Sequence, residues 1–335
     1  MSDPVVPGPA TSAGTSWPRP VGFGAWDSRE IGRPGLVRLD DTLWLFHAGC
    51  DSHFDWKLGA AVSVDGGATW ERVTDDPILS PPATRVSGGG WHSYLDPSAV
   101  TEADGTVRLL FATLGDRPGT GVASAVSTDL VDWSEPVIEL APGRGADGRS
   151  VVDLRAPWVA EGADGRRWLW VARVETHGDG HRTTALQRYE RVEAAWSGEA
   201  WRAAGEPIVD PAGGEVDHPC AVALADGSWR LWCSSFRDGT WRILGATSAD
   251  GDAWSRLEIA LEGDAASPYE TSGVFGPAVV RLVDGYLLLH LGSSRTSDGM
   301  SVAVFARRSA DAVSWERLGD RPVLHPRPGI PVRPW

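Results

Sequence analysis

The chain has 335 residues, 42% of them hydrophobic, so it can bury a large core in one or two domains. Its formal net charge of −14 argues against nucleic acid and anionic membrane surfaces as partners. The 40 glycines, 24 prolines and 18 tryptophans, with short alternating apolar runs such as VRLLFATL and RRWLWVARV, favour an all-β protein.

The first residues, MSDPVVPGPATSAGTSWPRP, contain neither the basic start nor the apolar stretch of a signal peptide. We therefore predict a disordered segment over 1–22, then a single domain over 23–335, in a cytoplasmic protein. No apolar run approaches the length of a membrane span. The three cysteines, Cys50, Cys220 and Cys233, lie in strand-like runs without CxxC spacing, which predicts reduced, buried thiols.

A repeated pattern organises the rest of the chain. About every 60 residues a proline opens a short apolar strand, followed by a turn and a second strand rich in Trp, Leu and Phe. The five copies are RPGLVRL, DPSAVTE, APWVAEG, HPCAVAL and GPAVVRL, with their prolines at Pro34, Pro97, Pro157, Pro219 and Pro277.

A third strand in most repeats leads into a Ser-x-Asp turn closed by tryptophan. The copies are SVDGGATW, STDLVDW, SADGDAW and SADAVSW, while the third repeat instead carries Trp196 and Trp201. The Asp can accept backbone N–H bonds, and the Trp can pack between repeats, so we interpret these turns as structural. Fourth strands follow in DPILSP, EPVIEL, EPIVDP, LEIALE and RPVLHP. Four strands repeated five times predict a five-bladed β-propeller with four-stranded antiparallel blades around a central channel.

The innermost strand of each propeller blade lines the channel, and the proline-headed strands are the best candidates for it. Residues next to the five prolines should then converge on one pocket rich in carboxylates, histidines and arginines. The residues directly before the prolines are Arg33, Asp96, Ala156, His218 and Gly276, and close by in sequence lie Trp91, His92, Arg155, Trp158, Asp217 and Glu270.

On these motifs the sequence resembles the furanosidase-type glycoside hydrolases of family 43 and their relatives in family 32, over roughly residues 23–330. The resemblance implies a base, Asp96 in LDPSAV, and an Ala-Pro strand in APWV. It also implies an orienting Asp217 in VDHPCAV and an acid, Glu270 in YETSGVF. The order is shifted by one blade from the family's. His218 stands between Asp217 and Pro219, and Glu270 lies well ahead of Pro277.

Several of these residues have two interpretations. Arg33 either binds a carboxylate or phosphate bidentately or bridges blades. His92 and His218 are either substrate hydrogen-bonding groups or core histidines. Trp91 and Trp158 either stack on a sugar or pack. Asp217 is either the orienting residue or the partner of Arg155 in an ion pair between blades, and Arg155 itself is a candidate substrate ligand.

The resemblance implies hydrolysis of a small glycoside with inversion, by one carboxyl group that protonates the leaving oxygen and one that activates water. Two alternatives stay open, namely a biosynthetic lyase or cyclase on the same scaffold and a non-catalytic carbohydrate-binding propeller. No phosphate loop, dinucleotide fingerprint or zinc motif occurs, so no cofactor is expected, with a structural Ca²⁺ left open. The default partner is a small molecule, and the default assembly is a monomer.

Overall fold

The computed structural model describes residues 25–51, 54–82, 91–115, 119–143, 150–162, 165–177, 179–191, 201–296 and 299–327. The predicted disordered segment 1–22 lies outside these residues. The described part is built from strands and contains no helix, which confirms the all-β prediction. Within it, accordingly, no helix is long and apolar enough to cross a membrane.

The strands form antiparallel meanders of four strands that are consecutive in sequence. The first three meanders are separate sheets. Their strands are β1 (Glu30–Leu39), β2 (Thr42–Cys50), β3 (Lys57–Ser63) and β4 (Glu71–Arg72); β5 (Trp91–Thr101), β6 (Val107–Gly115), β7 (Gly121–Ser127) and β8 (Val137–Leu140); and β9 (Ser150–Glu161), β10 (Arg167–Thr176), β11 (Arg182–Arg191) and β12 (Trp201–Ile208).

Two further meanders share one sheet, because a single parallel bridge between Trp241 and Gly273 joins them. Their strands are β13 (Glu215–Ala223), β14 (Trp229–Arg237), β15 (Thr240–Ser248) and β16 (Glu258–Leu261); and β17 (Gly273–Leu282), β18 (Gly285–Thr296), β19 (Gly299–Ser309) and β20 (Glu316–Arg317). The predicted pattern of four antiparallel strands per repeat is thus present.

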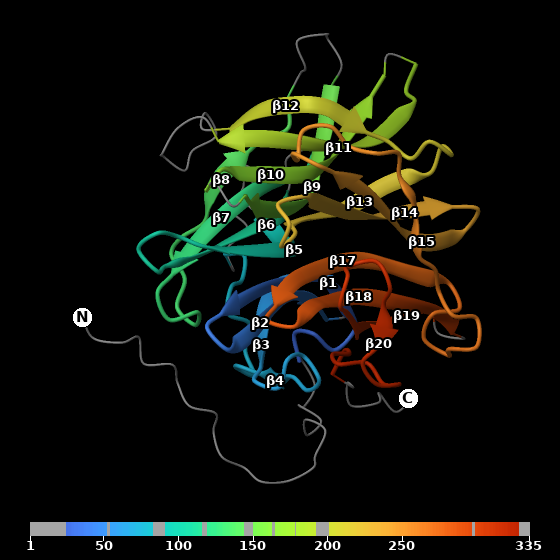
Figure 1. Cartoon of the computed structure of the whole chain (residues 1–335). Coiled ribbons are helices and arrows are strands. Elements are labelled where there is room, and N and C mark those ends of the chain that lie inside the picture. Colours follow the sequence, from blue (N-terminus) through green and yellow to red (C-terminus); the bar gives the residue numbers. More distant parts are fainter. Residues whose placement is uncertain are drawn as a thin grey trace, which may run out of the picture.

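The first strands of the meanders form a closed ring at the centre of the molecule (Figure 1). Strand β1 contacts β5, β5 contacts β9, β9 contacts β13, β13 contacts β17, and β17 returns to β1. The later strands of each meander lie farther from the centre, as β8, β12 and β4 show in Figure 1. The ring is the arrangement that propellers use to bring residues from distant parts of the chain to one channel.

Each of the five repeated prolines lies inside the first strand of its meander, next to a β-bulge. The register shifts where β1, β5, β9, β13 and β17 pass their prolines. The prediction that the proline opens the strand is therefore wrong, since every one of these strands begins several residues earlier. A bulge leaves a residue unpaired in the ladder, so proline, which has no N–H to donate, is tolerated there.

The bulges hold non-glycine residues in the left-handed region. Asp96 has φ 51°, Ala156 has φ 50° and His218 has φ 52°, while Gly276 occupies the same position of β17 with φ 63°. Residues before proline normally adopt extended backbone, so the left-handed conformation is strained at Asp96, Ala156 and His218. Such strain persists where the surrounding structure fixes the backbone. The bulge also turns these side chains away from the faces that they would occupy in a regular strand.

The Ser-x-Asp turns are structural, as predicted. In the last copy, Ser309 Oγ donates to Asp311 Oδ1 at 2.8 Å, and the backbone N–H groups of Val313 and Ser314 donate to the same oxygen at 2.8 Å each. The tryptophans that close the turns pack on the second strand of the preceding meander. The pairs are Trp133 with Phe46 at 5.9 Å between ring centroids, Trp254 with Trp170 at 5.5 Å and Trp315 with Trp232 at 5.9 Å.

Replacing Asp311 with alanine is expected to destabilise the protein at neutral pH and to lose its effect in acid. The backbone N–H bonds lower the pKa of Asp311 to about 2, below its value of about 3.9 in an unfolded chain. A lowered pKa contributes stability that is present above the unfolded value and is lost as pH falls through about 2. Urea unfolding of both proteins across this pH range measures the difference. Exposed Asp41, 3.6 Å from Arg38, supplies the control Asp41→Ala, which should show no such convergence.

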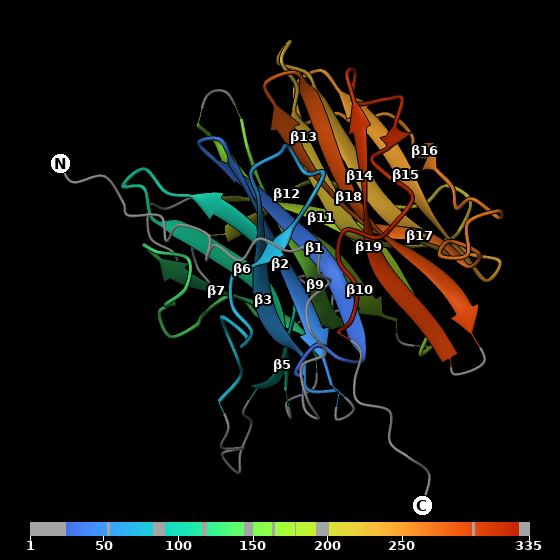
Figure 2. The same ribbon diagram turned by 90° about the horizontal axis from the view of Figure 1, so that it is seen from below.

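Ion pairs and hydrogen bonds of side chains connect the first and last meanders. Arg327 pairs with Asp27 and with Asp75, and its backbone N–H donates to Asp27 O at 3.2 Å. Arg72 donates to Asp27 Oδ2 at 3.0 Å and to the carbonyl of His325 at 3.0 Å. Strand β1 lies beside β19 where these two meanders meet (Figure 2). The three cysteines are buried and unbridged, as predicted.

Candidate functional site

Arg33 fills the centre of the ring. Its Nη1 donates to the carbonyls of Ala156 and Pro157 at 3.3 Å each, and its Nη2 donates to those of Pro219 at 2.5 Å and Pro277 at 3.4 Å. One guanidinium thus binds carbonyls of β9, β13 and β17 that the bulges release from the sheets. Only 1% of Arg33 is exposed. Arg33 on β1 therefore bridges its own meander to three others, whereas a substrate-binding role for it stays a prediction.

Beside Arg33 lies a group of four polar side chains, Asp96, Arg155, Asp217 and His218, which we call the channel cluster. His218 Nε2 lies 3.8 Å from Asp96 Oδ1, and Arg155 Nη2 lies 3.1 Å from Asp217 Oδ2. Their side chains are 17% exposed for Asp96, 14% for Asp217 and His218, and 34% for Arg155. The cluster therefore combines residues from three different strands, β5, β9 and β13, and each of its side chains keeps some contact with solvent.

Burial sets the protonation of the cluster. It raises the pKa of Asp96, an effect that the charge of Asp217 adds to and that His218, Arg33 and Arg155 oppose. It lowers the pKa of His218, although Asp217 and Asp96 act in the other direction. A carboxyl group with a raised pKa is a stronger base when ionised, and a histidine with a lowered pKa is neutral at pH 7. The cluster therefore contains a carboxyl group of raised basicity beside an uncharged imidazole.

An aromatic wall borders the cluster on the β13–β17 side. Trp241 stacks on Phe275 at 5.0 Å and packs at a tilt against Phe236 at 4.9 Å between ring centroids. The ring of His218 contacts Phe275 at 5.9 Å and Trp241 at 6.3 Å. Such a wall excludes water from one side of the cluster and offers an apolar surface to a ligand.

The sequence reasoning missed this wall, although a signal for it exists. When the repeats are aligned at their prolines, Arg155, Asp217 and Phe275 all stand two residues before the proline. Their strands are neighbours in the ring, so these positions lie side by side. Alignment on this position predicts both the Arg155–Asp217 ion pair and the aromatic residue next to it.

Glu270 does not join the channel cluster. Its side chain is fully buried, with Oε2 accepting from Arg317 Nη2 at 2.6 Å and from the backbone N–H of Asp264 at 3.0 Å. Oε1 lies 3.5 Å from Arg307 Nη2, and Arg307 Nε faces His290 Nε2 at 3.0 Å. The expected acid thus serves in this structure as the common counter-charge of two arginines on β19 and β20.

Glu270→Gln is expected to lower the free energy of unfolding by about 3–5 kcal/mol, because two arginines lose their buried counter-charge. Turnover per folded molecule should be unchanged. Chemical unfolding and activity normalised to folded protein measure the two effects separately. Glu258→Gln, at an exposed position of β16, is the matched control. Loss of turnover in a fully stable Glu270→Gln protein would instead restore Glu270 as the acid.

The remaining predicted ligands are distributed around the ring. Trp158 is buried, donates from Nε1 to the carbonyl of Ala221 at 2.9 Å, and lies 5.2 Å from the guanidinium carbon of Arg33, so it packs. His92 is half-buried, with Nδ1 3.4 Å from Ser93 Oγ. Trp91 lies in β5, but its side chain is outside the described residues.

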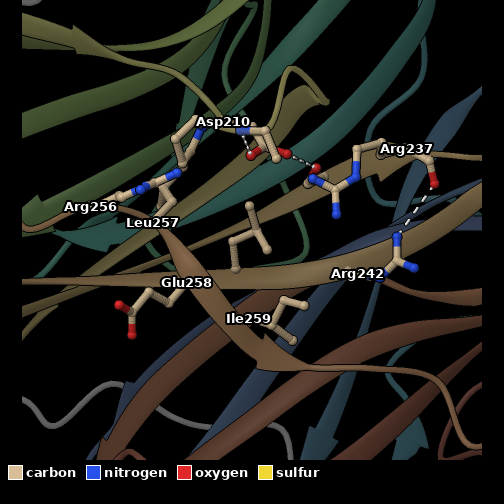
Figure 3. A pocket seen from close by; sticks show the side chains of 11 residues that line it. Asp210, Arg237, Arg242, Arg256, Leu257, Glu258 and Ile259 are labelled. Carbon is tan, nitrogen blue, oxygen red and sulfur yellow. Dashed lines mark hydrogen bonds between the residues drawn. The ribbon is translucent and has the colours of Figure 1, made fainter.

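A separate pocket of about 500 Å³ lies over β14–β16, lined in part by Asp210, Arg237, Arg242 and Arg256 (Figure 3). Its buried carboxylate is already occupied, because Asp210 accepts from Ser235 Oγ at 2.7 Å and from Ala212 N–H at 2.8 Å. The pocket contains no histidine and no second buried carboxylate, so it lacks the acid–base chemistry of the channel cluster. Among the described residues, no three His, Cys, Asp or Glu side chains converge as metal ligands.

Comparison with known proteins places the fold. No family model and no curated protein matches the sequence. A thermostable family-43 glycoside hydrolase matches with a TM-score of 0.66 at 12% identity, over 92% of this chain and 99% of its own. An α-L-arabinanase of Cellvibrio cellulosa, solved with arabinohexaose, matches with a TM-score of 0.62 at 12% identity, over 87% and 96%.

An exo-1,5-α-L-arabinanase from a bovine ruminal metagenomic library matches with a TM-score of 0.58 at 14% identity, over 86% of this chain and 95% of its own. The chain therefore has the fold of the propeller glycoside hydrolases of family 43. At these identities the likeness shows the fold alone, and activity must be argued from the site.

Proposed function

We propose that the protein is a glycoside hydrolase whose five groups of four strands are the blades of one propeller and whose active site is the channel cluster. The single observation that carries the proposal is the pair Asp96 and His218, two strained bulge residues from different strands whose side chains are 17% and 14% exposed and whose Oδ1 and Nε2 atoms lie 3.8 Å apart. Strained polar residues that converge in a pocket are characteristic of functional sites.

Asp96 is the proposed base. Its raised pKa makes it a competent acceptor of a water proton. Asp217, held by Arg155, is proposed to orient the substrate through hydrogen bonds to sugar hydroxyl groups. The aromatic wall of Phe236, Trp241 and Phe275 provides the apolar surface on which a sugar face or an aglycone packs.

The proposed substrate is a small glycoside with a leaving group that departs without strong acid assistance. Glu270 is buried against its arginines, and Asp217 is held by Arg155, so neither carboxyl group is placed to protonate a leaving group. An aryloxide or a similarly stable anion leaves readily with solvent as its proton source. We therefore expect aryl glycosides to be hydrolysed much faster than alkyl glycosides of the same sugar.

The test is a hydrolysis screen of the purified protein with aryl α-L-arabinofuranoside, β-D-xyloside, β-D-fructofuranoside and galactosides. Turnover of one of them, with ¹⁸O from labelled water in the released sugar, supports the proposal.

A second candidate is a lyase or cyclase on the same scaffold, which the burial of Glu270 favours. It predicts a product from the accepted substrate without oxygen from water.

A further inference from the structure

A hydrogen-bonded chain runs from the buried backbone of β17 to His218, whose ring faces Asp96. The backbone N–H of Gly276 donates to Ser234 Oγ at 2.8 Å, and Ser234 Oγ lies 3.1 Å from His218 Nδ1. The opposite nitrogen of the same ring, Nε2, faces Asp96 Oδ1. Three meanders therefore meet in one line of polar atoms, from Gly276 through Ser234 and His218 to Asp96.

This chain fixes which nitrogen of His218 carries the proton. Ser234 is fully buried, and its oxygen already accepts from Gly276. Its own hydroxyl hydrogen needs an acceptor, and among the described residues His218 Nδ1 is the one within reach. Nδ1 is then the unprotonated nitrogen, so neutral His218 carries its proton on Nε2, pointing toward Asp96.

The gap between His218 and Asp96 suits an oxygen atom. At 3.8 Å, Nε2 and Oδ1 are too far apart for a direct hydrogen bond, yet an oxygen can lie about 2.9 Å from both. Such an oxygen would accept from Nε2–H and donate to the carboxylate. A water molecule or an alcohol hydroxyl has both capacities, whereas an ether or carbonyl oxygen lacks the donor.

We propose that His218 is a catalytic residue that, with Asp96, holds the attacking water, and that Ser234 is the positioning residue that fixes the imidazole tautomer. The inference rests on the proposed function. Asp96 takes one proton of the water as the water oxygen bonds to the anomeric carbon. The glycosidic C–O bond breaks, its electron pair leaves with the aglycone oxygen, and that oxygen takes a proton from solvent. Asp96 then returns its proton to solvent.

The charged groups that face His218 come from every strand packed against it. They are Asp96 on β5, Arg33 on β1, Arg155 on β9 and Asp217 on β13, while β15 and β17 present the uncharged Trp241 and Phe275. The two carboxylates favour the imidazolium and the two arginines oppose it, so burial decides the balance and keeps the ring neutral at pH 7.

The first experiment needs no substrate. Long-range ¹H–¹⁵N spectra of ¹⁵N-histidine-labelled protein distinguish protonated from unprotonated ring nitrogens, and His218→Gln identifies the signals of His218. We expect an Nε2–H tautomer at pH 7 and a mixture of tautomers in Ser234→Ala. Ser235→Ala, on the same strand but the opposite face, is the control and should leave the signals unchanged. An Nδ1–H tautomer, an imidazolium at pH 7, or no response to Ser234→Ala would overturn the inference.

The second experiment uses whichever aryl glycoside the screen identifies. Ser234→Ala is expected to lower kcat about tenfold with little change in KM and to shift the pH profile, and Ser234→Thr, which restores a hydroxyl, should recover most of the loss. A change in KM alone would contradict a role in holding water. If no glycoside is turned over while the tautomer results hold, the proposed hydrolase activity fails and the fixed Asp96–His218 pair stands.

Discussion

Asp96→Asn is expected to lower kcat by about 10²–10⁴-fold while leaving the protein at least as stable as the wild type at pH 7. The loss follows because asparagine cannot accept the proton of the attacking water. Stability is kept because asparagine is among the residues that best tolerate the left-handed conformation, φ 51°, that position 96 adopts. Steady-state kinetics and urea unfolding of the same preparations measure both quantities.

The stability effect of this substitution also has a definite pH dependence. Burial raises the folded-state pKa of Asp96 above the unfolded value, so the carboxyl group favours folding at low pH. That contribution is lost as pH rises through the folded pKa, which asparagine avoids. The advantage of Asp96→Asn should therefore grow with pH.

The control is Asp153→Asn on β9, whose carboxylate binds Thr120 N–H and Arg182 outside the cluster and whose loss should not affect turnover. Full activity in Asp96→Asn would end the hydrolase proposal.

Arg33→Met is expected to lower the free energy of unfolding by about 3–5 kcal/mol, a loss as large as the one expected for Glu270→Gln. Methionine fills much of the same volume but donates no hydrogen bond, so the carbonyls of Ala156, Pro157, Pro219 and Pro277 lose their buried donor. Urea unfolding measures the change, and Arg202→Met, at an exposed position of β12, should stay within about 0.5 kcal/mol of wild type.

Arg33→Lys tests geometry apart from charge. Lysine keeps the positive charge near Asp96 but cannot reach several carbonyls with one planar fork, so we expect an intermediate loss of stability. A destabilisation below about 1 kcal/mol in Arg33→Met would show that solvent or repacking replaces the guanidinium, and that the ring does not depend on it.

The repeat was readable from the sequence because its spacing and turn chemistry are local. Each proline and each Ser-x-Asp turn marks an element that the chain forms with its immediate neighbours, and the four-stranded meanders follow. The fourth strands were less regular than expected. The predicted fourth strands DPILSP and RPVLHP are wrong, since each segment contains only an isolated bridge, at Leu79 and Leu324, and the short strands β4 and β20 lie before them in the chain.

The bulges and the site partners were harder to predict, because they depend on contacts between distant strands. Nothing local to VDHPCAV says that His218 turns toward Asp96, some 120 residues away in sequence, since a regular strand would alternate its side chains differently. Nor does YETSGVF reveal that Glu270 meets Arg307 and Arg317 from later strands. The resemblance identified Glu270 in YETSGVF as a candidate acid, whereas its ion pairs with Arg307 and Arg317 determine the position of its side chain.

The way the ring closes bears on the order of the motifs. Every meander consists of consecutive strands, and the described chain begins and ends at one hydrogen-bonded junction between Asp27 and Arg327. Among the described residues, the first and last meanders share no sheet. A circular permutant opened at the exposed turn of Ala212 and Gly213 and joined across that junction should therefore retain all the described sheets. A ring of this kind has no obligatory starting sheet. A functional pattern displaced by one sheet, as the sequence resemblance implies for Asp96, would then occupy an equivalent place around the ring.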